Sequence, residues 1–204
     1  LFLELGDSEK ALKNYSLSRE VYRKAGMTDR EALALVGVGS VYQRMGEKTK
    51  ALGVLEEANR TAPQKSWRVL HYLGVAQYVA GRPMEALATL EGALAMARAS
   101  HTPSNEAPTL LALGLVYKDL DKPELAADLF GRAIAAGSAI ELQRVVAPAL
   151  LRRAMLWSDL GRLTAARNDI EGALKIMEST RANIAGSQLR TSFLANRRNF
   201  YEFY

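Results

Sequence analysis

The sequence predicts an all-α fold made of repeated antiparallel helix pairs. Three observations support this prediction: one residue pattern recurs along the chain, its small residues stand at helical spacings, and a turn residue divides each copy in two. Recurrence at a period of about 20 to 50 residues is typical of solenoids, in which each repeat packs on its neighbours. The domain organisation therefore follows from the positions of the copies.

Each full copy contains a small residue, a turn residue, an alanine, a large apolar residue and a second small residue. In the first copy these are Gly39, Gly46, Ala51, Leu55 and Ala58. The later copies contain Gly74, Gly81, Ala86, Leu90 and Ala93, then Gly114, Asp121, Ala126, Phe130 and Ala133, then Ala154, Gly161, Ala166, Ile170 and Ala173. Positions three or four apart share a helix face. The small residues therefore let two helices approach closely, and the large residue fills the space beside them.

These copies define four predicted repeats, which follow a truncated one. The truncated repeat covers residues 1–27, the full repeats cover residues 28–63, 64–103, 104–138 and 139–178, and residues 179–204 lie beyond the pattern. Each turn residue is expected to end one helix and let the chain reverse. Pro83 and Pro123 follow their turns at the first helical position, where a missing N–H is tolerated.

The boundaries between repeats also contain typical helix signals. Gly26 and Gly137 are predicted to follow the last residues of their helices, as glycines that adopt a left-handed conformation. The stretches "TDRE" at residues 28–31 and "SAIE" at residues 138–141 have the spacing of a capping box. We therefore expect each of them to begin the next helix.

Composition excludes several classes of function. The 204 residues include no cysteine and only two histidines, which excludes thiolate chemistry and disfavours a metal or acid–base site. No apolar run has the length of a membrane helix, and the N-terminus does not resemble a signal peptide. We therefore expect a cytoplasmic, non-enzymatic chain that carries no cofactor.

The pattern resembles the tetratricopeptide repeat family from Leu1 to about Glu178. Besides the residues above, Tyr42, Tyr117 and Trp157 stand at the family's aromatic position, and Pro63 closes one repeat. If Gly6 of the truncated copy is included, the turn residues are 40, 35, 40 and 40 residues apart, whereas the family repeat has about 34 residues. The resemblance implies a right-handed superhelical solenoid whose first helices line a concave groove for a protein or peptide.

Candidate groove residues are those that the repeat register places on the first helices. They are Arg44, Arg68, His71, Tyr72, Tyr78, Leu111, Leu115, Lys118, Arg152 and Met155. The alternative is that the two leucines and Met155 pack on neighbouring helices and that His71 is structural. In this family, a clamp for C-terminal carboxylates uses asparagine and lysine or arginine. The corresponding positions here hold Gly37, Ser40, Tyr72 and Val75, which disfavours an adaptor for chaperone tails.

Residues 179–204 are predicted to form a non-repeat helix that covers the last repeat near Ile170 and Leu174. Its apolar docking face would consist of Leu189, Phe193, Phe200 and Phe203. The stretch that ends in "FYEFY" resembles the junction at which bacterial tetratricopeptide repeats precede a caspase-like CHAT protease domain. The resemblance implies a larger bacterial protein with a missing downstream domain, and the uncovered aromatic side chains would favour self-association.

Two other functions remain open at this point. The repeats could form the peptide-sensing region of a transcriptional regulator, in which case the coding sequence upstream would contain a helix-turn-helix. Arg181, Arg190, Arg197 and Arg198 could form a nucleic-acid patch, although arginines in such positions are more often solvated or paired with acids. A steep salt dependence of binding would favour the patch.

Overall fold

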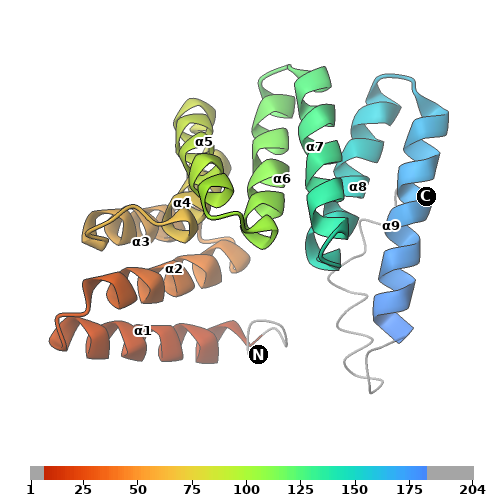
Figure 1. The fold of residues 1–204 in the computed structure, drawn as a ribbon. Helices are drawn as coiled ribbons and strands as arrows, with labels where there is room; N and C mark the ends of the chain where they lie inside the picture. The colour runs from red at the N-terminus through yellow and green to blue at the C-terminus, as the bar shows by residue number, and fades with distance from the viewer. Residues whose placement is uncertain (1–6, 183–204) are drawn as a thin grey trace. The chain divides into compact units, whose positions relative to one another are not determined.

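The computed structural model describes residues 7–182, which form nine α-helices and no strand (Figure 1). The helices are α1 (Ser8–Lys24), α2 (Thr28–Arg44), α3 (Lys48–Thr61), α4 (Trp67–Val79), α5 (Pro83–Ala99), α6 (Pro103–Asp119), α7 (Pro123–Ser138), α8 (Gln143–Asp159) and α9 (Leu163–Ala182). The chain divides into two compact units, Leu1–Asn105 and Glu106–Tyr204.

In the first unit, helices that are consecutive in sequence pack on one another. α2 contacts α1 and α3 and also reaches α4, and α4 packs on α5. Leu35, Leu55, Val69 and Leu73 belong to one buried cluster shared by α2, α3 and α4, and Tyr72 packs partly buried against it. The second unit follows the same scheme, because α8 packs on both α7 and α9.

The small positions of the repeat pattern lie where the two helices of a pair approach most closely. A Cβ atom built on Gly39 would lie 2.5 Å from Cγ of Leu55, and one built on Gly114 would lie 2.5 Å from Cε1 of Phe130. Both large side chains are completely buried. The predicted alternation of a small residue with a large one therefore describes the packing within these helix pairs.

The predicted turn residues adopt the left-handed conformation. Gly46, Gly81 and Gly161 have φ angles of 76°, 79° and 71°, and Asp121 takes the same conformation at 55° without being glycine. Aspartate is one of the few residues with a side chain that visits this region readily. Pro83 and Pro123 occupy the first positions of α5 and α7, as the sequence predicts.

The predicted capping boxes were wrong. The N-cap of α2 is Met27, which makes no side-chain cap hydrogen bond, and Thr28 is already helical. Residues 138–141 do not begin a helix either, because α7 extends through Ser138 and α8 begins at Gln143. At these boundaries, tight backbone turns replace side-chain caps: the Met27 and Leu142 carbonyls accept the first helical hydrogen bonds.

The two glycines between repeats have different roles. Gly26 has a φ angle of 68° and follows the C-cap of α1, as predicted. Gly137 lies inside α7, and the left-handed residue of that connection is Glu141, at 53°. A Cβ atom on Gly137 would lie 2.8 Å from Cγ2 of Val146, so this glycine allows α7 to approach α8.

Candidate functional site

Four predicted groove residues stand on α2 and α4, two helices that contact each other: Arg44 on α2, and Arg68, Tyr72 and Tyr78 on α4, which together are called the α2–α4 face below. Arg44 and Arg68 are exposed, and neither forms an ion pair within residues 7–180. Tyr72 and Tyr78 are half-buried on α4. The Gln43 amide donates a hydrogen bond of 3.5 Å to the Tyr72 carbonyl oxygen, which links the two helices across this face.

His71 is buried within an aromatic group on α4. Only 9% of its surface is exposed, its ring stacks on Trp67 at a centroid distance of 5.4 Å, and it meets the edge of Tyr72 at 5.3 Å. This arrangement fills the start of α4 with aromatic side chains. The ring contributes to the shape of the α2–α4 face more than to its accessible surface.

In the second unit the predicted groove residues divide into two groups. Leu111 and Leu115 pack partly buried against the cluster that contains Phe130 and Leu156, and Met155 packs against a cluster that contains Met177. Their apolar surface is therefore largely used within the fold. The other two, Lys118 and Arg152, are half-buried and exposed, respectively.

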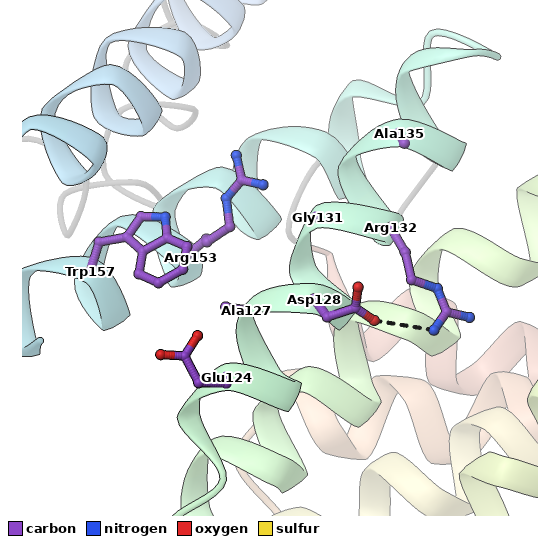
Figure 2. Close-up of a pocket in the computed structure, with 8 residues that line it drawn as sticks. All are labelled: Glu124, Ala127, Asp128, Gly131, Arg132, Ala135, Arg153 and Trp157. Atoms are coloured by element: carbon purple, nitrogen blue, oxygen red, sulfur yellow. Dashed lines mark hydrogen bonds and ion pairs between the residues drawn. The ribbon is translucent and has the colours of Figure 1, made fainter. Parts of the chain in front are cut away.

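A pocket of about 450 Å³ that the sequence did not reveal opens between α7 and α8 (Figure 2). Ala127, Gly131 and Ala135 leave room along α7, and Arg153 and Trp157 extend from α8 on the other side. The three small residues stand four apart in the sequence, so they share one helix face. That spacing was visible in the sequence, but nothing in it indicated that α8 would leave the stripe partly uncovered.

Each charged group that lines this pocket has an ion-pair partner. Arg153 forms a bidentate ion pair with Asp169 of α9, with both N–O distances at 2.7 Å. Arg162 pairs with Glu124 at 2.7 Å, and its guanidinium lies 4.8 Å from the ring centroid of Trp157. At the other end of the pocket, Arg132 and Asp128 pair at 3.3 Å (Figure 2). Because these charges are satisfied internally, the pocket offers little to a charged ligand.

The described part of the chain contains no cluster of acidic or histidine side chains suited to a metal ion. Within residues 7–182, no helix is both long and apolar enough to cross a bilayer. The predicted docking face of Leu189, Phe193, Phe200 and Phe203 lies outside the described residues.

Comparison with known proteins supports the repeat assignment. Residues 68–139 match the family model described as tetratricopeptide repeat. No curated protein sequence matches the chain.

Solved structures with the same fold cover most of the chain. BtubC (BKLC) from P. vanneervenii is 18% identical with a TM-score of 0.69, covering 96% of this chain and 83% of its own. MamA from Desulfovibrio magneticus RS-1 is 16% identical with a TM-score of 0.61, covering 87% and 90%. YrrB, described as a repeat protein with an unusual peptide-binding site, is 17% identical with a TM-score of 0.54, covering 94% and 85%. The prediction of an all-α solenoid of paired helices is therefore confirmed.

Proposed function

We propose that this chain, of which residues 68–139 match the tetratricopeptide repeat model, is a non-enzymatic scaffold that binds a protein or peptide. The observation that carries the proposal is the α2–α4 face of the first unit. There the unpaired Arg44 and Arg68 accompany the half-buried Tyr72 and Tyr78. Aromatic side chains give a large contact area at a low entropic cost, and exposed arginines add directional hydrogen bonds.

The two tyrosines have different roles in this proposal. Tyr72 packs against the buried cluster of α2, α3 and α4, so it supports the face as well as contributing to it. Tyr78 does not belong to that cluster. We therefore expect Tyr78 to be the aromatic side chain that can be replaced with the smaller loss of stability.

Selection of a random heptapeptide phage library on the immobilised chain would test the proposal. Peptides selected on the wild-type chain should bind the Arg44→Glu/Arg68→Glu double variant at least about tenfold more weakly, because two favourable charges become unfavourable. The matched control is Lys175→Glu, which reverses an exposed, unpaired charge on α9. Peptides that bind the double variant as tightly as the wild type would contradict the proposed face.

We further propose that these repeats recruit or sense a partner for a CHAT protease domain that follows residue 204 in the complete protein. Support comes from the resemblance of the stretch from Arg181 to Tyr204 to the junction in such bacterial proteins. Reading the coding sequence for about 200 residues beyond Tyr204 tests this proposal. If the downstream sequence were unrelated to CHAT domains, the protease proposal would be wrong, and the proposed scaffold function would be unaffected.

A further inference from the structure

A second groove lies where α1, α2 and α3 meet, and no part of the proposed function uses it. Its volume is about 350 Å³. Val38 and Tyr42 of α2 and Val54 of α3 provide apolar surface, and α1 contributes charged side chains along one side. Val38 is buried, whereas Tyr42 and Val54 are half-buried, so part of this apolar surface is accessible.

This groove is on a different side of α2 from the face that α2 shares with α4. Residues two apart on a helix are about 200° apart around its axis. Tyr42 lines the groove, whereas Arg44 belongs to the α2–α4 face. A single short peptide segment would therefore bind to one of the two surfaces at a time, and each surface can be tested by its own variants.

The α1 side of the groove is basic, and one of its arginines, Arg23, forms no ion pair among the described residues, although, after the hydrogen bond from Lys24, its charge also helps to lower the pKa of the Glu20 carboxyl. α1 carries five basic and two acidic side chains, so its net charge is +3. Arg19 pairs with Glu57 and lies 3.7 Å from Glu31. Arg23 is exposed and has no ion-pair partner among the described residues.

The remaining acid of the groove is already occupied. Lys24 donates a hydrogen bond of 2.6 Å to Glu20, and this bond lowers the pKa of the Glu20 carboxyl. Glu20 therefore stays ionised and paired. The Arg23 guanidinium is left as the group available to an incoming anion.

The pocket between α7 and α8 provides an internal comparison. Tyr42 and Trp157 stand at the same position of the repeat pattern, so the two hollows correspond. In the α7–α8 pocket each arginine has an acidic partner, and α7 has a net charge of −1. Unlike the α7–α8 pocket, the groove beside α1 combines accessible apolar surface with a cation that has no ion pair among the described residues.

We propose that the groove between α1, α2 and α3 binds a partner-protein segment in which an apolar side chain adjoins a carboxylate. The apolar side chain contacts Tyr42 and Val54, and the carboxylate pairs with Arg23. Charge complementarity selects this class of segment, because the α1 side is positive and the free donor is a guanidinium, which matches carboxylate geometry. The inference concerns a second surface and is independent of the α2–α4 face.

The probe is a fluorescein-labelled nine-residue peptide with a central leucine flanked by two glutamates on each side. Binding to the full chain is measured by fluorescence anisotropy at low salt. Two counterparts replace the glutamates with lysine or the leucine with serine. We expect the acidic, apolar peptide to bind most tightly and both counterparts to lose at least about fivefold in affinity.

Variants locate the site. Arg23→Glu should weaken the acidic peptide about fivefold or more, because it replaces an attraction with a repulsion at an exposed position. Ser16→Trp, which adds bulk at the exposed edge of the groove without changing charge, should weaken it as well. Arg132→Glu reverses an exposed charge in the α7–α8 pocket and should leave the affinity unchanged. Circular dichroism confirms that each variant is folded.

Several outcomes would overturn the proposal. These are equal binding of the lysine peptide, an unchanged affinity after Arg23→Glu, or an equal loss after Arg132→Glu. Amide chemical-shift changes centred on Arg44 and Arg68, with none at Tyr42 and Val54, would place the peptide on the α2–α4 face. That result would reject binding in the groove and leave the proposed α2–α4 face standing. Failure of the phage selection alone would reject the α2–α4 face and leave the groove proposal standing.

Discussion

Two glycines in one helix pair should respond in opposite ways to the same substitution. Gly39 in α2 and Gly53 in α3 both lie inside helices of the first unit. A Cβ atom on Gly39 would lie 2.5 Å from Cγ of the fully buried Leu55, whereas one on Gly53 would meet nothing within 4 Å. Alanine should therefore destabilise the fold at the first position and stabilise it at the second.

The magnitudes follow from two competing contributions. Replacing glycine with alanine inside a helix stabilises by about 0.5–1 kcal/mol, and at Gly53 nothing opposes this gain. At Gly39 the new methyl group is roughly 1 Å too close to Leu55 for an ordinary carbon–carbon contact. Overpacking of this kind costs about 1–3 kcal/mol, so after the helical gain is subtracted Gly39→Ala should lower the free energy of unfolding by up to about 2.5 kcal/mol.

Urea unfolding followed by circular dichroism gives the free energy of unfolding for each variant. The helical gain is common to both variants, so the free energies of unfolding of Gly39→Ala and Gly53→Ala should differ by the overpacking cost, about 1–3 kcal/mol. If both variants changed the free energy of unfolding equally and in the same direction, the loss of glycine's backbone freedom would explain both effects. Close helix contact at Gly39 would then not be the reason for the small residue.

Four other changes test separate features by the same unfolding measurement or by peptide binding. Asp169→Asn should cost about 1–3 kcal/mol, because it leaves the largely buried Arg153 without its carboxylate; an unchanged midpoint would contradict a stabilising ion pair. Gly81→Ala should cost about 1–2 kcal/mol from its φ angle of 79° alone, since no atom crowds the new Cβ; a stabilised variant would show that the turn adapts. Ala86→Leu should cost about 1–3 kcal/mol because Ala86 is completely buried; normal stability would place the close contact elsewhere. Tyr78→Ala should weaken phage-selected peptides by about 1–3 kcal/mol with a small loss of stability; undiminished binding would remove Tyr78 from the face.

The fold could be predicted because its determinants are local and repeated. Gly39, Gly114 and their large partners lie close together in sequence on consecutive helices, so helix periodicity and the tight turn between the two helices bring them into contact. The turn at Asp121 was predictable for a related reason, since it occupies the place that glycine holds in the other copies. Gly137 was misinterpreted because a glycine required by packing looks the same in a sequence as one required by a positive φ angle.

The candidate sites depend more strongly on tertiary structure. The pairing of Arg153 with Asp169 links α8 to α9, and the pairing of Arg19 with Glu57 links α1 to α3. Neither spacing is a motif, so the sequence could not show which arginines are neutralised and which, like Arg23, stay available. Likewise, the sequence could place His71 on a helix face, but only the packing shows that Trp67 covers it.

The order in which the helices pack has a consequence for folding kinetics. The main contacts within the described part of the first unit join helices that follow each other in the chain; α2 also packs on α4, and Arg19 of α1 pairs with Glu57 of α3. Few distant segments must meet before a helix pair is stabilised, so the entropic cost of loop closure is small. Chains of such low contact order reach their native state quickly, and repeat arrays can begin folding at any pair and extend from it. A substitution that weakens the α2–α3 pair should therefore move the starting point of folding to α4 and α5 instead of slowing the whole chain in proportion to the lost stability.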